Sequence, residues 1–162
     1  MTGLTAPTFG TCYVFGYDIR NHSDMTMIRR MTGVCPQHDI LFDDLTPREH
    51  LYFFAAVRGI NEAEIESDVN KTLKDCDLME NCDTVVKHLS GGQKRKLSVG
   101  IAIIGDPRII IFDEPTAGVD PYSRRCLWQL LQSIKKGKVI LLTTHFMDEG
   151  ELRKICIIMH KF

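Results

Sequence analysis

The chain has 162 residues, of which 44% are hydrophobic and 25% are charged, close to the average for soluble globular domains. This composition excludes a disordered tail and a collagen-like fibre, and the length allows one domain or one core with a small subdomain. Twenty Lys and Arg residues balance 21 Asp and Glu residues, so the formal net charge is -1. Dedicated nucleic-acid binders usually carry a large basic excess, and we therefore expect no nucleic-acid partner.

Cysteine usage and hydropathy indicate the cellular setting. The chain has no Cys-x-x-Cys pair and no Cys/His cluster at zinc-finger spacing, which favours reduced thiols in a cytosolic chain over a disulfide framework. The longest strongly apolar stretch, residues 97–105, is far shorter than the ~20 residues that span a bilayer. The uncharged first 17 residues lack a basic start and are broken by glycines and a proline. We therefore expect neither a transmembrane segment nor a signal peptide.

Apolar runs alternate with helical patterns along the chain. Strand-like runs are found at residues 12–15, 31–34, 108–112, 139–142 and 155–159. The unbroken run Ile109-Ile110-Ile111-Phe112 is typical of a strand that is buried on both faces of a parallel sheet. The pattern therefore predicts an α/β fold with a largely parallel sheet.

Helix start signals dominate the middle of the chain. Thr46-Pro47-Arg48-Glu49 has the spacing of a capping box with proline at the first helical position, and Gly59 would end this helix. A second helix start near Asn61 precedes an apolar face that consists of Ile65, Val69 and Leu73. Residues from about 46 to 88 are therefore predicted to form a helical insertion between two strand-bearing parts.

Polar residues that follow the predicted strands are candidates for chemistry. Asp113 and Glu114 come directly after the run 108–112, and a parallel strand delivers its last residues to the sheet edge where ligands bind. Gln37 and His145 follow two other strands and are expected at the same edge. One carboxylate could hold a metal ion and the other a water molecule. Two solvated acids and a structural histidine would also fit this pattern.

The glycine-containing segment 90–93 is a second, independent indication of a ligand-binding site. Ser90-Gly91-Gly92-Gln93 has capping-box spacing, and its serine would cap a helix. The N–H groups of the two glycines would then be unobstructed, and such a helix N-terminus attracts anions through hydrogen bonds and the helix dipole. In isolation, an ordinary turn capped by serine is the simpler interpretation. A further helix is predicted to begin at Asp120-Pro121.

Taken together and in order, these motifs resemble the nucleotide-binding domain of ATP-binding cassette (ABC) transporters over nearly the whole chain. Gln37 falls at the Q-loop glutamine and His145 at the switch histidine. Residues 89–93 match the signature motif, residues 109–113 the Walker B strand and residues 117–120 the D-loop. The stretches 33–42 and 113–125 look most like subfamily A, whose members mostly export or flip lipids.

The resemblance implies a P-loop NTPase-like parallel sheet with helices on both faces, plus an inserted α-helical subdomain. It divides the chain 1–162 into a RecA-like core, made of residues 1–45 and 89–162, and a helical subdomain of about residues 46–88.

The resemblance also implies cofactors and catalytic roles. The cofactors would be ATP and Mg²⁺. Asp113 would hold Mg²⁺, Glu114 would polarise the attacking water, and His145 would contact the γ-phosphate. Gln37 would help to complete both the metal site and the water site.

The implied partners are a second nucleotide-binding domain and the transmembrane domains of a transporter. In a head-to-tail dimer, five residues would act across the interface on the partner's nucleotide: Ser90, Gly91, Gly92, Gln93 and Asp120. The helical subdomain would dock on the transmembrane domains, so the domain would lie at the cytoplasmic face of a membrane.

The sequence also departs from the family. The phosphate-binding motif G-x-x-x-x-G-K-[ST] is absent from these 162 residues. In the family this loop lies upstream, and the helix after it ends in a segment that resembles residues 1–4. The resemblance therefore implies an N-terminally truncated domain whose sheet lacks a strand in its middle. Near the other end, the family's Asp-Arg pair is missing before Ile155.

Three interpretations follow. The first is a fragment of a subfamily A transporter, whose parent couples ATP hydrolysis to lipid movement. The alternative is a non-catalytic truncated module that pairs with or blocks an intact cassette. A soluble ABC ATPase acting on DNA or ribosomes would need a coiled-coil insertion or a basic surface, and the sequence contains neither. The basic clusters 94–96, 124–125 and 135–136 are expected to be solvated helix faces.

We predict that the 162-residue chain by itself shows no measurable binding of Mg-ATP. The amides and lysine of the missing loop would make charge-assisted hydrogen bonds worth roughly 1.5–3 kcal/mol each. Their loss removes on the order of 5–10 kcal/mol, which is enough to abolish micromolar binding. Equilibrium titration of the purified chain with Mg-ATP measures this directly, and a clear micromolar affinity would contradict the prediction.

Overall fold

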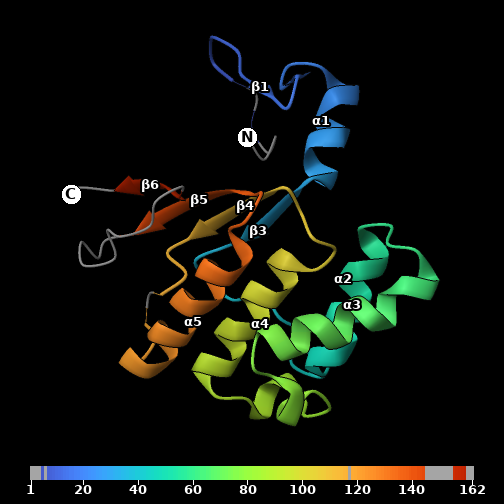
Figure 1. Ribbon diagram of the computed structural model, residues 1–162, viewed down its shortest axis with the longest axis vertical. Helices are drawn as coiled ribbons and strands as arrows, with labels where there is room; N and C mark the ends of the chain where they lie inside the picture. Colours follow the sequence, from blue (N-terminus) through green and yellow to red (C-terminus); the bar gives the residue numbers. More distant parts are fainter. Residues whose placement is uncertain (1–4, 6, 117, 145–154, 160–162) are drawn as a thin grey trace.

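The core of the molecule is a four-stranded parallel sheet. The structure, a computed structural model, describes residues 5, 7–116, 118–144 and 155–159. The strands are β3 (Thr32–Cys35), β4 (Ile109–Asp113), β5 (Val139–Thr144) and β6 (Ile155–Met159), paired in the order β3-β4-β5-β6 (Figure 1). These strands match the predicted apolar runs, and the predicted parallel α/β fold is confirmed.

One expectation about the sheet is wrong. The absent loop strand predicted a gap in the middle of the sheet, but β5 pairs directly with β6 from Ile140↔Ile155 to Thr144↔Met159. The described strands therefore form an unbroken ladder. The physical reason is that β6 satisfies the backbone N–H and C=O groups that would otherwise be unpaired along the edge of β5.

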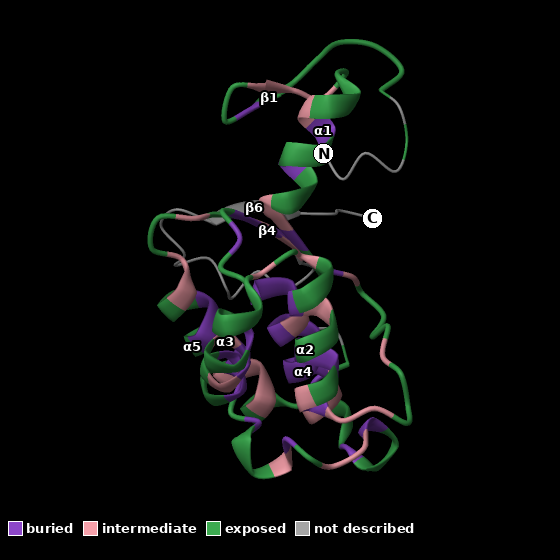
Figure 2. Cartoon of the chain, turned by 90° about the vertical axis from the view of Figure 1, so that its right-hand side faces the viewer, coloured by how far each residue is buried: buried purple, intermediate pink, exposed green. Residues whose placement is uncertain are grey.

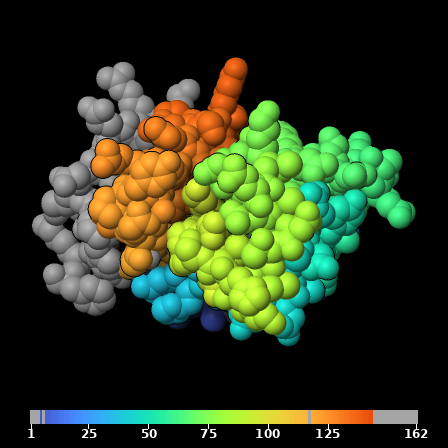
Figure 3. Space-filling model, turned by 90° about the horizontal axis from the view of Figure 1, so that it is seen from below, coloured from blue at the N-terminus to red at the C-terminus, as the bar shows by residue number. Residues whose placement is uncertain are grey.

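Helices lie on both sides of this sheet. On one side are α4 (Gly91–Ile103) and α5 (Pro121–Ile134), with α2 (Pro47–Val57) and α3 (Glu62–Asp75) beside α4 (Figure 1). On the other side, Met25 and Ile28 of α1 (His22–Arg30) form a small apolar cluster with Ile109. Seen from below, α4 and α5 adjoin in the middle of the helical face (Figure 3).

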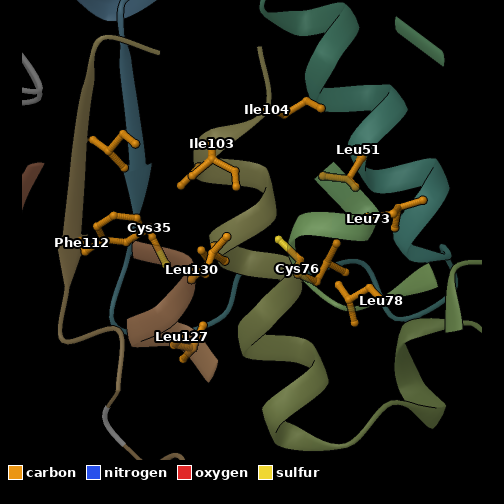
Figure 4. Close-up of a cluster of buried hydrophobic side chains, with 14 of the residues drawn as sticks. Cys35, Leu51, Leu73, Cys76, Leu78, Ile103, Ile104, Phe112, Leu127 and Leu130 are labelled. Atoms are coloured by element: carbon orange, nitrogen blue, oxygen red, sulfur yellow. The ribbon is translucent and has the colours of Figure 1, made fainter. Parts of the chain in front are cut away.

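Helix α4 is the central helix of the core. It lies between the sheet, represented by Phe112 and Cys35, and the helices α2 and α3, represented by Leu51 and Leu73 (Figure 4). Most of its residues are buried, and the purple ribbon of α4 shows this (Figure 2). Because α4 is surrounded, Arg95 and Lys96 are only 3% and 9% exposed. The expectation that residues 94–96 are a solvated helix face is therefore wrong for these two residues.

Close packing of α4 on β3 requires a glycine. A Cβ atom on Gly33 would lie 1.9 Å from the carbonyl oxygen of Ala102, near the end of α4. Arg58 donates to the same oxygen at 3.2 Å and to that of Ile101 at 3.4 Å. Because the obstacle is a backbone atom, no side-chain rearrangement could make room for a larger residue.

The capping signals in the middle of the chain are confirmed. Thr46 and Glu49 form both hydrogen bonds of the capping box of α2, and Gly59 adopts a positive φ of 76° just after that helix. Asn61 caps α3. Between residues 46 and 88, the regular elements are α2, α3 and the short 3-10 helices η1 (Met79–Asn81) and η2 (Val86–His88). The division into a core and a helical subdomain stays a prediction.

The N-terminal part contains the strand predicted at residues 12–15, together with a second strand and a helix that sequence patterns did not reveal. Strands β1 (Tyr13–Val14) and β2 (Tyr17–Asp18) form a hairpin around Phe15 and Gly16, whose φ values of 49° and 88° are typical of a type I′ turn. The guanidinium of Arg108 lies 4.2 Å from the centre of the Phe15 ring. Helix α1 was not predicted, although Asn21 caps it. Within the described residues, no helix is long and apolar enough to cross a membrane.

His50 fixes the chain between β3 and α2. Its imidazole is fully buried, accepts a hydrogen bond from the Phe42 N–H at 2.9 Å through Nε2, and lies 2.9 Å from the Thr46 carbonyl oxygen through Nδ1. Since a carbonyl oxygen can only accept, Nδ1 carries the proton and the ring is neutral. Burial lowers the pKa of His50 below its usual value of 6.5.

We predict that the chain loses stability as the pH falls below about 6.5, because the unfolded state then binds a proton that the folded His50 excludes. Above that pH the contribution of His50 is fully present. The free energy of unfolding in urea, measured between pH 7.5 and pH 5, should decrease less steeply in His50→Gln. An unchanged slope in His50→Gln would contradict the assignment.

Candidate functional site

Three parallel strands end at one edge of the sheet. Cys35 is paired with Phe112, and Asp113 is paired with Thr143, so the residues that follow β3 and β4 emerge side by side. There the Gln37 side-chain amide donates from Nε2 to Glu114 Oε2 at 3.1 Å. The expected placement of Gln37, Asp113 and Glu114 at one edge is thus confirmed. His145 lies outside the described residues.

Thr143 forms hydrogen bonds with both Asp113 and Glu114. Its hydroxyl donates to Asp113 Oδ1 at 2.6 Å. The N–H of Glu114 in turn donates to the hydroxyl oxygen and the carbonyl oxygen of Thr143, at 3.0 and 3.1 Å. The sequence analysis did not identify Thr143. It could have been expected near Asp113, because β4 and β5 are neighbouring parallel strands that end at the same edge.

Glu114 has a strained backbone. Its φ of 45° lies in the left-handed region, which costs a non-glycine residue on the order of 1–2 kcal/mol. Two sets of hydrogen bonds hold this conformation: those of its N–H to Thr143, and that of its carbonyl oxygen with Arg95 at 3.1 Å. The strain is localised at the residue whose side chain meets Gln37.

The oxygen atoms at this edge suit a magnesium ion. Asp113 is exposed and offers a carboxylate, while Gln37 uses its Nε2 for Glu114 and keeps Oε1 as the atom that could face a cation. Among the described residues, no group of three or more His, Cys, Asp or Glu side chains could hold a metal ion. Mg²⁺ commonly uses one or two protein carboxylates together with phosphate oxygens and water, so the donor set fits that mode.

The N-terminus of α4 is closed by the predicted capping box. Ser90 Oγ accepts from the Gln93 N–H at 3.3 Å, and Gln93 Oε1 accepts from the Ser90 N–H at 2.9 Å. The Gln93 amide also donates from Nε2 to Asn81 Oδ1 at 2.8 Å. The side chain of Gln93 therefore anchors α4 to η1 within this chain.

The two glycines of this turn have different surroundings. A Cβ atom on Gly91 would meet no heavy atom within 4 Å, whereas one on Gly92 would lie 2.8 Å from Ser123 Oγ of α5. Asp120 caps α5 by accepting from the N–H groups of Tyr122 and Ser123, both at 3.0 Å. The hydrogen bonds from Ser123 lower the pKa of Asp120. The N-termini of α4 and α5 thus adjoin, and of the two glycines Gly91 is the one exposed to solvent.

Arg95 connects α4 to both strand ends. Its guanidinium is buried and donates to the carbonyl oxygens after β3 and β4 and to one carboxylate. The acceptors are Pro36 O (2.7 Å), Gln37 O (3.2 Å), Asp39 Oδ1 (3.0 Å), Asp113 O (3.2 Å), Glu114 O (3.1 Å) and Pro115 O (2.7 Å). Ser98 also donates to Asp39 Oδ1, at 2.8 Å. Sequence reasoning missed this role because it assigned Arg95 to a solvated face.

One described cleft of the molecule lies away from the sheet edge. This cleft of about 320 Å³ lies between α3 and the last turns of α4 and α5. Its charged lining residues are aspartates and lysines. None of the candidate residues lines this cleft. The described part of this cleft is therefore not the place where the candidate residues gather.

The chain matches known proteins over most of its length. The family model described as ABC transporter matches residues 1–117. The ATP-binding cassette sub-family A member 2 of Rattus norvegicus is 48% identical over 162 residues, which are 99% of this chain and 7% of that protein. The phospholipid-transporting ATPase ABCA3 of Mus musculus is 49% identical over 152 residues, which are 94% of this chain and 9% of that protein.

Solved structures agree with these matches. An ATP-binding subunit of an ABC transporter is 30% identical, with a TM-score of 0.79, and the match covers 98% of this chain and 65% of that one. The ATP-binding cassette MJ0796, in a dimeric post-hydrolysis state with ADP and Pi, is 25% identical with a TM-score of 0.79, covering 92% and 68%. With the family model matched over more than half of its residues, the chain belongs to the ABC transporter family and most resembles subfamily A.

Proposed function

We propose that this chain is part of an ATP-hydrolysing cassette that powers transport by a subfamily A transporter. The observation that carries the proposal is the hydrogen bond between Gln37 and Glu114, beside Asp113, at the carboxyl edge of the sheet. Because the chain spans only 7% and 9% of the two relatives named above, the activity belongs to a longer protein.

Each residue at the edge has a chemical task in this proposal. The Glu114 carboxylate polarises the attacking water, and the hydrogen bond from Gln37 fixes the direction of that carboxylate. Asp113 and Gln37 Oε1 would hold Mg²⁺, which would neutralise charge on the phosphates. His145, which lies outside the described residues, would contact the γ-phosphate. These residues position the water and orient the substrate, and such positioning is the main contribution of proteins to phosphoryl transfer.

The start of α4 serves the nucleotide of a second cassette. Gly91 exposes a helix N-terminus that a phosphate can approach, with Ser90, Gly92 and Gln93 forming the rest of that turn. Asp120, at the adjoining start of α5, lies at the same interface. The dimeric state of the cassette MJ0796 supports a pairing of two cassettes.

Transmembrane domains are the second partner. Five large apolar side chains near the start and outer face of α2 are exposed: Ile40, Phe42, Tyr52, Phe53 and Val57. Phe42 and Phe53 contact each other edge to face, with ring centres 6.1 Å apart. Exposed aromatic groups of this kind mark protein interaction sites, and a cytoplasmic segment of the membrane domain would cover them. The phospholipid-transporting relative supports a lipid as the transported substrate.

We predict that Glu114→Gln, in the full-length protein that carries this cassette, lowers kcat for ATP hydrolysis by about a hundredfold or more, because the amide cannot accept a proton from water. ATP binding should persist, since Gln keeps the size of the side chain. Steady-state hydrolysis and equilibrium binding of Mg-ATP measure the two effects.

The outcomes separate the proposed function from the alternative. Loss of hydrolysis with retained binding supports a catalytic cassette. If the native protein binds and hydrolyses no ATP at this cassette but alters the activity of a second cassette, the non-catalytic module is correct. A Glu114→Gln variant that hydrolyses ATP at the native rate would refute the role of Glu114. In a lipid flip assay, no ATP-dependent lipid movement would refute the substrate class.

A further inference from the structure

Arg95 belongs to helix α4, and its guanidinium contacts two loops. The proposed function assigns the helix and the loops to different nucleotides. Helix α4 begins at the turn that faces the nucleotide of the partner cassette. The acceptors of Arg95 belong to the loop of Gln37 and to the segment of Glu114, which act on the nucleotide of this cassette. Arg95 is therefore the described side chain that directly joins both sets of residues.

The bonding of Arg95 depends on the shape of its side chain. A guanidinium is planar and presents five N–H donors in a fixed fork, whereas an ammonium is a point charge with three donors. Here Nη1 serves the loop after β3, while Nε and Nη2 serve the segment after β4. Only one of the acceptors is a carboxylate, that of Asp39. The remaining contacts are to backbone oxygens, so they fix the course of the main chain.

The contact with Glu114 is the most informative one. Its left-handed backbone is costly and is held on the N–H side by Thr143 and on the C=O side by Arg95. Without Arg95, the peptide after Glu114 could rotate towards a less strained conformation. The carboxylate would then leave the position in which it accepts from Gln37.

We propose that Arg95 is a positioning residue for ATP hydrolysis, which holds Glu114 and the Gln37 loop in a fixed relation to α4. Gln37 and Glu114, which act on the nucleotide of this cassette, then move as one unit with α4. Helix α4 is the helix that covers the nucleotide of the partner cassette. This inference rests on the proposed function. Arg95 does not touch the nucleotide, so its loss affects the rate of the chemical step more than the affinity for ATP.

Lys96 provides a matched control on the same helix. It is also a buried cation, and its Nζ forms an ion pair with Asp77 at 2.8 Å. Its contacts lie away from Gln37 and Glu114, so Lys96→Gln removes a comparable buried charge without touching the proposed positioning contacts. A purely structural role of buried charges on α4 would affect both variants alike.

The test compares Arg95→Gln with Lys96→Gln in the full-length protein that carries this cassette. In Arg95→Gln we expect kcat to fall about tenfold to a hundredfold, because a shift of about 1 Å in a catalytic group has effects of that size. KM for ATP should stay within about threefold of the native value. Lys96→Gln should retain the native kcat. Arg95→Lys should behave like Arg95→Gln, since it keeps the charge but not the fork.

A double variant distinguishes positioning from general damage. If Arg95 acts through Gln37 and Glu114, Gln37→Ala should reduce kcat much less in the Arg95→Gln background than in the native protein. Additive losses would overturn the proposal, as would a kcat for Arg95→Gln equal to that of Lys96→Gln, or a raised KM with an unchanged kcat.

Two further measurements keep the result unambiguous. If Arg95→Gln does not fold, Arg95→Lys and Asp39→Asn, which loosens the guanidinium without removing it, are judged by the same kcat and KM criteria. Glu114→Gln runs alongside. If Glu114→Gln hydrolyses ATP like the native protein, the proposed function has failed. If Glu114→Gln is inactive while Arg95→Gln, Arg95→Lys and Asp39→Asn are all fully active, only the role of Arg95 is refuted.

Discussion

Helix α4 can contact strand β3 only because Gly33 has no side chain, since a Cβ atom there would collide with the Ala102 carbonyl oxygen. This contact sets the register between the helix and the strand. From Ala102 back to Arg95 the helix spans seven residues, or about 10 Å at 1.5 Å per residue. From Gly33 forward to Pro36 the strand advances three residues, again about 10 Å at 3.3 Å per residue. The two distances match, so Arg95 meets the chain where β3 ends.

The parallel sheet creates the acceptors that Arg95 needs. Carbonyl groups beyond the last residue pair of a parallel strand have no partner in the ladder, and those that are buried must find a donor elsewhere. The strands β3 and β4 end side by side, so their unpaired carbonyl groups gather in one place. Arginine supplies several donors and no acceptor, which makes it the side chain best suited to such a place. The charge of the guanidinium is balanced by Asp39, which Ser98 also contacts.

Sequence patterns predicted those features that depend on neighbouring residues. The caps at Thr46, Asn61, Ser90 and Asp120 are local hydrogen bonds, and each of the four predicted helix starts is present. The gathering of Gln37 and Glu114 followed from a general rule about parallel strands. The surroundings of Arg95 could not be predicted in this way, because its burial results from elements on every side of α4. Its charged neighbours Lys94 and Lys96 suggested a solvated face instead.

The conformation of Glu114 likewise depends on residues that are distant in the sequence. The type of residue at position 114 indicated its chemistry, but its strained conformation depends on Thr143, from β5, and Arg95, from α4. Neither residue resembles a catalytic group in the sequence. The direction of the Glu114 carboxylate therefore depends on the ends of β4 and β5 and on α4. A site of this kind transmits any displacement of α4 to the carboxylate, because the same guanidinium bonds to both segments.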